Sequence, residues 1–545
     1  MHFYNLGNYS RSVTTRSDQA QRWFDQGLIW LYGFNHEAAI ECFRRALEAD
    51  PDCAMAQWGI VHAAGPNYNR QWETFEPEEK HEAMALARPA AKAATLLIER
   101  VSPVERALIQ AVQHRAPEAM VEDFGPCLDG YADAMRDAYR AHTDDLDVIA
   151  LFAEALLNRT PWQLWDLPTG EPATGADTLE AKAVLERAFG DIEGAWDHPG
   201  LLHMYIHLME MSPYPELALR HGDRLSALVP DAGHLVHMAT HIDVLCGDYH
   251  NVVGRNELAI AADRRFLERE GADNFYTVYR CHNYHFKIYG AMFLAQPTPA
   301  LEAADELVAT LPESLLRQMA DWFEAFVPMK QHVLIRFGMW EAILAQPLPE
   351  DVALYATTLA MMRYARTVAL ANSGEIAEAE AERDRFFAAQ QVVPESRLLF
   401  NNTAVDILKV AEQMMLGELE YHSGRHDAAF AHLYRAVELD DTLPYDEPWA
   451  WMQPARHALG ALLLDQGRLD EAEAVYRADL GLDDTLSRAC QHPQNVWSLH
   501  GLYECLTRRG EAVEVLHIKH QLDRAAARAE VPVRASCYCR SRVAT

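Results

Sequence analysis

The stretch QRWFDQGLIWLYGFNHEAAIECFRRALEADP, residues 21–51, decides the fold of this chain. Its small and apolar positions are occupied by Gly27, Ala39, Phe43, Ala46 and Pro51. Small side chains at these positions let one helix pack closely on the next, and the proline ends the second helix because it cannot donate a helical hydrogen bond. The stretch therefore predicts one helix pair of a repeat protein.

The same pattern recurs later in the chain. It is found in GRHDAA, residues 424–429, and again between Gly460 and Tyr476, with a less regular copy around Gly374 and Ala379. This arrangement is typical of the tetratricopeptide repeat, in which each unit buries its apolar face against its neighbours and the first helix of each unit lines a concave wall. We therefore predict an all-α fold, a tetratricopeptide-type α-solenoid.

Three parts are expected along the chain. Residues 1–17 form an N-terminal extension, residues 18–525 a continuous array of repeats, and residues 526–545 a tail in which the apolar period is lost. Two polar interruptions of the array, residues 66–77 and 160–178, contain tryptophans. Long loops in a compact array are commonly functional or disordered, and the tryptophans favour loops that are packed against the helices.

Composition and charge exclude several classes of function. The 545 residues carry a formal net charge of −32 with a sequence pI near 5.1, which opposes binding to nucleic acid or to an anionic membrane. The nine cysteines are scattered, apart from Cys537 and Cys539, which fits a reducing compartment. No apolar run is long enough to span a bilayer and no apolar leader begins the chain, so we predict a soluble cytoplasmic protein.

Residues 198–290 are unusually rich in histidine. His203 and His207 are four residues apart, as are His237 and His241, and the second pair follows the first by 34 residues. Residues four apart share one face of a helix, and a step of about 34 residues is one tetratricopeptide period. We therefore expect both pairs to project from neighbouring helices into the concave groove.

A third pair and a carboxylate extend this set. His282 and His285 depart from the period of the first two pairs, while Glu210 lies one turn after His207. Neighbouring helices lie about 8–10 Å apart, so imidazoles from three helices can converge on one or two ions. The predicted metal ligands are His203, His207, His237, His241, His282 and His285.

Imidazole ligands suit several transition metals. Histidine-rich sites serve Cu, Fe and Zn alike. We favour Cu or Fe for this chain, with Zn possible. Glu210 and Glu154 are the predicted catalytic residues, as ligands or proton acceptors. Further candidates would hold a ligating imidazole in place or contact the substrate: His234, Asn158, Trp58, His62, Asn67, Asn69 and Asn283. The alternative stays open that some of these, His62 above all, are ordinary hydrogen-bonded core or loop residues.

Several of these segments occur together in one known family. They are HPGLLHMYIHLMEMSPYPELAL at residues 198–219, PDAGHLVHMATHI at 230–242, HNYHF at 282–286 and YDEPWAW at 445–451. With them the chain resembles the tetratricopeptide repeat protein 38-like family over nearly its whole length. The resemblance implies the α-solenoid and assigns no reaction. This chain departs from the family pattern at Ala239 and Thr240, where a proline followed by a small residue is expected.

Three functions remain open at this stage. The first is a metal-dependent oxidoreductase that acts on a small molecule in the concave groove, using dioxygen. The second is a non-catalytic adaptor whose groove binds a peptide or protein partner, because repeat proteins commonly do this and a fold alone does not establish an enzyme. The third is a zinc-dependent hydrolase.

Overall fold

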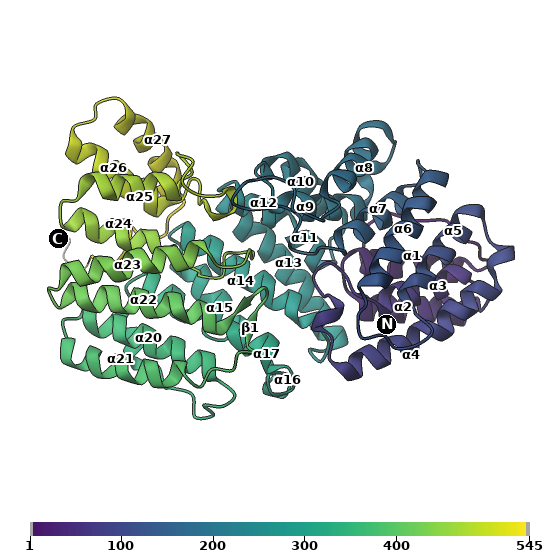
Figure 1. Ribbon diagram of the computed structural model, residues 1–545, viewed down its shortest axis with the longest axis horizontal. Helices are drawn as coiled ribbons and strands as arrows, with labels where there is room; N and C mark the ends of the chain where they lie inside the picture. The colour runs from purple at the N-terminus through teal and green to yellow at the C-terminus, as the bar shows by residue number, and fades with distance from the viewer. Residues whose placement is uncertain (1–3, 541–545) are drawn as a thin grey trace. The chain divides into compact units, whose positions relative to one another are not determined.

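The computed structural model describes residues 4–540 of the chain, and it is built almost entirely of helices (Figure 1). The chain divides into two compact units. The first comprises Met1–Ile242 with Leu258–Tyr276, and the second Asp243–Glu257 with Thr277–Thr545. The fold class predicted from the sequence, an all-α tetratricopeptide-type α-solenoid of stacked helix pairs, is confirmed. The continuous array that the sequence predicts over residues 18–525, with its N-terminal extension and its tail, stays a prediction.

Helices account for the regular structure of the first unit. They are α1 (Asp18–Tyr32), α2 (His36–Ala49), α3 (Ala54–Ala64), α4 (Pro77–Leu96), α5 (Pro103–Val112), α6 (Gly125–Ala141), α7 (Leu146–Leu157), α8 (Thr178–Asp191), α9 (Pro199–Glu210), α10 (Leu219–Leu228) and α11 (Gly233–His237). Two further helices, α12 (Ala239–Leu245) and α13 (Tyr249–Glu270), are divided between the units.

The second unit contains the more regular repeats. Its helices are α14 (Thr277–Phe293), α15 (Pro297–Ala309), α16 (Glu313–Gln318), α17 (Ala320–Phe323), α18 (Met329–Arg336), α19 (Trp340–Ala345), α20 (Ala356–Asn372), α21 (Ile376–Gln390), α22 (Ala404–His422), α23 (His426–Asp441), α24 (Ala455–Asp465), α25 (Leu469–Asp479), α26 (Val496–Arg509) and α27 (Glu514–Ala526). A two-residue antiparallel pair, β1 (Leu398–Leu399) with β2 (Asn402–Thr403), precedes α22. From α20 to α25 the helices pack in successive pairs, α20 with α21, α22 with α23 and α24 with α25, and α20 lies between α21 and α22 (Figure 1).

Close packing of helix pairs depends on the glycines that the sequence pattern contains. A methyl group added at Gly27 of α1 would lie 2.6 Å from the ring of Phe43, and one added at Gly59 of α3 would lie 2.5 Å from it. Helices α1 and α3 therefore both rest directly on the Phe43 ring of α2. Gly460 stands in the same relation to Tyr476, at 2.5 Å. Any larger side chain at these positions would force the helices apart.

The turn inside each helix pair needs a left-handed residue. Glycine occupies this position at Gly374, Gly424 and Gly467, where φ is 85°, 79° and 71°. In the pair α1–α2 the equivalent residue is Phe34, with φ 57°. An L side chain is disfavoured in this conformation because its Cβ approaches the following carbonyl oxygen. An aromatic residue at this turn is therefore unusual.

The segment after α27 packs against the second unit. Ala535, Ser536 and Cys539 are buried, and the hydroxyl of Ser536 donates to the carbonyl of His457 at 2.9 Å. A disulfide joins Cys537 to Cys539. The structure thus places the described part of the predicted tail on the body of the unit. Within residues 4–540, no helix is both long and apolar enough to cross a membrane.

Buried neutral histidines make the stability of the second unit sensitive to acid. Burial lowers the pKa of His332 to about 3 and that of His457 to about 4. In the unfolded chain both titrate near about 6.5. As the pH falls from about 6.5 toward 4, the unfolded chain binds protons that the folded chain does not, so the free energy of unfolding decreases by about 1.4 kcal/mol per pH unit for each group.

This pH dependence can be measured by urea unfolding between pH 7.5 and 5. Burial raises the pKa of Glu418 and that of Asp440 to about 7, which opposes the histidines in the same pH range, so the expected result is a difference between proteins: the free energy of unfolding of the parent, relative to that of His332→Gln, decreases as the pH falls below about 6.5. The same slope in both proteins would contradict the assignment of His332 to this effect.

Candidate metal centre

Five histidines of the first unit come together from three helices. His203 and His207 lie on α9, His234 and His237 on α11, and His241 on α12. All five side chains are buried. Within each pair the ring centroids lie close, at 4.7 Å for His203 and His207 and at 4.8 Å for His237 and His241. Between the pairs, the centroids of His207 and His241 lie 6.0 Å apart.

The second histidine segment is not the single helix that its spacing predicted. Helix α11 ends at His237 and α12 begins at Ala239. The hydroxyl of Thr240 donates to the carbonyl of His237 at 2.7 Å, and the N–H of His241 donates to the carbonyl of Met238 instead. A threonine that bonds back to the main chain in this way interrupts the regular helical ladder. The histidines nevertheless stay together across the break.

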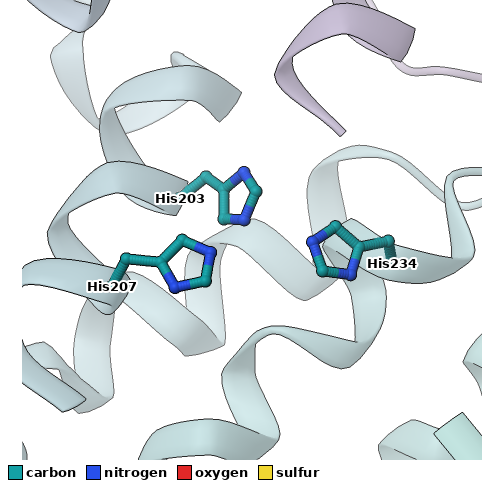
Figure 2. A group of neighbouring side chains, drawn as sticks. All are labelled: His203, His207 and His234. Atoms are coloured by element: carbon teal, nitrogen blue, oxygen red, sulfur yellow. The ribbon is translucent and has the colours of Figure 1, made fainter. Parts of the chain in front are cut away.

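His203, His207 and His234 form the group drawn in Figure 2. Each can offer one ring nitrogen such that the three nitrogens lie within 4.8 Å of one another. His203 and His207 extend from α9 toward His234, which faces them from α11 (Figure 2). From the sequence, His234 is expected only to support a ligating imidazole, but the structure places it beside the first pair, with its ring centroid 5.1 Å from that of His203.

Hydrogen bonds at Nδ1 fix three of the imidazoles. His203 Nδ1 donates to the carbonyl of Tyr32 at 2.6 Å. His207 Nδ1 donates to Glu210 Oε1 and His241 Nδ1 to Glu210 Oε2, both at 2.9 Å. A ring that donates from Nδ1 carries its lone pair on Nε2, and this is how proteins commonly orient histidines that bind metals. Glu210, predicted as a catalytic residue, uses both oxygens to hold imidazoles.

The Nε2 atoms of His203 and His207 have no hydrogen-bond partner among the described residues, although both are buried. Burial lowers the pKa of His203 to about 3 and that of His207 well below its usual value, so both rings are neutral at physiological pH. A buried acceptor without a partner is costly, and an ion bound there would satisfy it. The residues present therefore fit a metal ion that prefers nitrogen ligands.

His237 and His241 make a short contact through their Nε2 atoms, at 2.8 Å. His241 already donates from Nδ1 to Glu210. The Thr240 hydroxyl uses its proton on the carbonyl of His237, so it can only accept from His237 Nδ1, 3.3 Å away. When His237 donates from Nδ1 to Thr240, its Nε2 lone pair faces that of His241 and both nitrogens can bind one ion; in the other tautomer His237 Nε2–H donates to His241 Nε2.

An aromatic cover closes over this group. The ring centroid of Phe34 lies 4.5 Å from that of His203, and Tyr68 and Trp162 lie 4.5 and 5.9 Å from His207. Tyr68 and Trp162 belong to the two polar interruptions, which are packed down as expected, and the N–H of Trp162 donates to the Tyr68 hydroxyl at 3.2 Å. The cover buries these histidines, and their predicted position on the wall of the concave groove stays a prediction.

Glu154 pairs with other predicted residues. Its Oε2 lies 3.3 Å from His62 Nε2, and its Oε1 accepts from Asn158 at 3.2 Å. Burial alone would raise the pKa of Glu154, but the His62 imidazole and the Arg115 guanidinium hold it at about 2. The ring of Trp58 lies near that of His62, tilted by 45° with centroids 5.4 Å apart. The catalytic role predicted for Glu154 stays a prediction.

Asn67 and Asn69 occupy a tight turn. The N–H of Asn69 donates to Asn67 Oδ1 at 3.0 Å, and Asn67 exchanges main-chain hydrogen bonds with Arg70, both at 3.1 Å. Asn67 Oδ1 is thus used within its own loop, whereas Asn69 Oδ1 is buried without a hydrogen-bond partner among the described residues, and the role predicted for both asparagines stays a prediction.

His282, Asn283 and His285 lie on α14 and belong to the second unit. The ring of His282 lies 4.5 Å from that of Phe400, and His285 Nε2 contacts the sulfur of Met452 at 2.8 Å. Asn283 is fully buried. The ligand role predicted for His282 and His285, as a third pair that joins the first two, stays a prediction.

Comparison with known proteins identifies one tetratricopeptide repeat in this chain and no more specific family. The sequence pattern described as "Tetratricopeptide repeat" matches residues 20–53, which form most of α1 and all of α2. No curated protein sequence matches this chain. The more specific resemblance to the tetratricopeptide repeat protein 38-like family stays a prediction.

Two solved structures align with most of the chain. The crystal structure of the APC/C hetero-tetramer Cut9–Hcn1 is 12% identical, with a TM-score of 0.32 over 94% of this chain and 78% of that one. The structure of Naa15/Naa10 bound to HypK-THB is also 12% identical, with a TM-score of 0.22 over 93% and 75%. Scores this low add nothing to the fold that the helices establish.

Proposed function

We propose that the first unit binds one or two transition metal ions, Cu or Fe in preference to Zn, and uses them to oxidise a small molecule. One observation carries the proposal. The Nε2 atoms of His203 and His207 are buried without a hydrogen-bond partner in the described chain, and Nδ1 hydrogen bonds fix both rings in the tautomer that binds metal.

The surrounding residues would prepare these nitrogens for an ion. The carbonyl of Tyr32 and the carboxylate of Glu210 hold three rings in place, so little ordering remains to be done on binding. The rings of Phe34, Tyr68 and Trp162 exclude water from the histidines. A bound Cu or Fe ion would supply electron transfer to dioxygen, whereas Zn would supply only Lewis-acid chemistry.

Reconstitution distinguishes these chemistries. Protein stripped of metal and reloaded separately with Cu, Fe or Zn would be assayed for oxygen consumption with a panel of small molecules, and for ester and amide hydrolysis. Oxygen uptake with Cu or Fe that is absent in His203→Ala supports the proposal. Hydrolysis with Zn and no oxygen uptake with any metal would replace it with the hydrolase.

Glu210 offers a specific prediction about this centre. In Glu210→Gln the side chain keeps one oxygen acceptor and gains an N–H₂ group, which faces a second Nδ1–H donor. One imidazole therefore loses its partner, and metal affinity is expected to fall by about 10–100-fold. Competition titration with a chromogenic chelator measures this. The matched control is Glu216→Gln, which changes an exposed carboxylate nearby and should leave the affinity unchanged.

An adaptor function is the second candidate, and the repeat that matches residues 20–53 favours it. Tetratricopeptide arrays present extended surfaces that suit peptides. A protein partner that is retained after complete chelation, and equally by His237→Ala, would support the adaptor. A partner that is lost in both conditions would connect its binding to the metal centre.

A further inference from the structure

A surface cavity of about 230 Å³ lies against the cover of the histidines. Its wall includes Phe34, Arg70, Phe75, Phe275 and Tyr276. The ring centroid of Phe34 also lies 4.5 Å from that of His203, 5.8 Å from His207 and 5.7 Å from His234. The same side chain therefore forms part of the cavity wall and part of the histidine cover.

The main-chain conformation of Phe34 is disfavoured, which indicates that its aromatic side chain has a function. Phe34 stands at the turn position that Gly374 and Gly424 occupy in later repeats, with φ 57°. The turn is otherwise the same, since the N–H after Phe34 donates to the carbonyl of Trp30 as the N–H after Gly424 donates to that of Glu420. Glycine would fit here without steric cost, and disfavoured conformations of this kind cluster at functional sites.

A second residue of the cover has the same property. Trp162 also has a positive φ, 60°, and its ring lies edge-on to His207 with centroids 5.9 Å apart. Two aromatic residues in left-handed conformations thus face the same histidines from different segments of the chain. Their side chains cover the histidines, and each residue adopts a main-chain conformation that is disfavoured for an L residue.

Charge and aromatic rings define what the cavity would accept. Its wall carries three carboxylates, those of Glu37, Glu79 and Glu82, against the single guanidinium of Arg70. Arg70 pairs with Glu79 at 2.7 Å, while Glu37 and Glu82 are exposed. This excess of carboxylates, in a chain of net charge −32, disfavours anions.

The aromatic walls already hold a cation. The guanidinium of Arg70 lies over the rings of Phe75 and Phe275, 4.2 and 3.9 Å from their centroids. Because Arg70 already occupies a face of each ring, these rings offer an incoming molecule apolar contact together with Ile40 and Leu86, while the exposed carboxylates of Glu37 and Glu82 attract its cationic group. A molecule with a cationic group and an apolar body matches both features.

We propose that this cavity receives a small organic cation with an apolar body, such as a primary amine, and that Phe34 must move aside before the molecule can reach His203, His207 and His234. The inference rests on the proposed function in one respect, because it takes the histidines to be the reaction centre. The cavity and its charge do not depend on that assumption.

The first experiment tests Phe34 as the barrier. Protein loaded with Co²⁺ would be mixed with excess EDTA, and the loss of the visible cobalt absorption followed in the parent, in Phe34→Gly and in Ala295→Gly. Ala295 occupies the same turn position in the pair α14–α15, with φ 55°, and so controls for relief of the main chain. We expect release to be about tenfold faster in Phe34→Gly only. Equal rates in the parent and Phe34→Gly would overturn the barrier, as would equal acceleration in both variants.

The second experiment tests the cavity without any metal. Metal-free protein would be titrated calorimetrically with benzylammonium and with benzoate. We expect benzylammonium to bind, benzoate not to bind, and the double variant Glu37→Gln/Glu82→Gln to bind benzylammonium about tenfold more weakly. Binding of benzoate at equal affinity, or no binding of benzylammonium, would overturn the cation site. If benzylammonium binds but Co²⁺ does not, the proposed function and the barrier role fall, while the cation site stands.

Discussion

Replacement of His207 by alanine is expected to lower the affinity of the protein for its metal by at least about 100-fold, the upper end of what loss of an orienting partner alone costs. His207 would contribute a nitrogen directly, and it lies between the two parts of the centre. Its ring centroid is 4.7 Å from that of His203 and 6.0 Å from that of His241. The variant also removes one of the two imidazoles held by Glu210, so the carboxylate is left with less compensation.

The control for this variant is His81→Ala. His81 is exposed on α4, where its Nδ1 donates to the carbonyl of Pro77 at 2.7 Å. Competition with a chromogenic chelator measures the affinity in each protein, and circular dichroism checks that each is folded. An affinity in folded His207→Ala within about threefold of the parent would contradict the ligand role of His207.

Removal of the metal is expected to lower the midpoint of thermal unfolding of the first unit by about 10 °C. An ion present at about 1,000 times its dissociation constant stabilises the folded state by about 4 kcal/mol. For a unit of this size, each kcal/mol corresponds to about 2–4 °C.

Differential scanning calorimetry of the loaded and the chelated protein measures this shift. The second unit serves as an internal reference if it unfolds in a separate transition, and His207→Ala should show no shift on chelation. A midpoint that chelation leaves unchanged in the parent would mean that the histidines do not hold an ion that matters for folding.

The sequence predicts the helix pairs well because their packing depends on a few spaced residues. Gly27 and Gly460 lie where a ring of the next helix touches the main chain, so only glycine fits there. Such glycines recur at a regular spacing that can be recognised in the sequence. The turn at Phe34 could have been noticed in the same way, since later repeats carry glycine there. Only the structure shows that its ring lies on the histidines.

The spacing of the histidines predicts which of them lie close together, but it does not predict the helix break or the hydrogen bonds that fix their rings. The spacing of His237 and His241 is the same in a continuous helix and in one broken by Thr240, so the break between α11 and α12 could not be inferred. The double role of Glu210 depends on α12 lying beside α9, which is a tertiary fact. His234 was undervalued because its position at the start of a helix resembles that of a cap.

Tertiary contacts also determine the hydrogen-bond partners of the other polar residues that were predicted for the site. Burial of Glu154 in an apolar helix indicates that it needs a partner, and the structure supplies His62 from α3. Asn67 accepts a hydrogen bond from the main chain of its own loop through Oδ1. Residue type predicted that these groups would be bonded, but the identity of each partner depends on which helices become neighbours.

Elemental analysis of the protein, purified without an affinity tag and without added metal, tests the central claim most directly. The account predicts at least about one equivalent of Cu or Fe per chain, and its loss in His207→Ala. Less than about half an equivalent of any transition metal, unchanged in His207→Ala, would contradict the account.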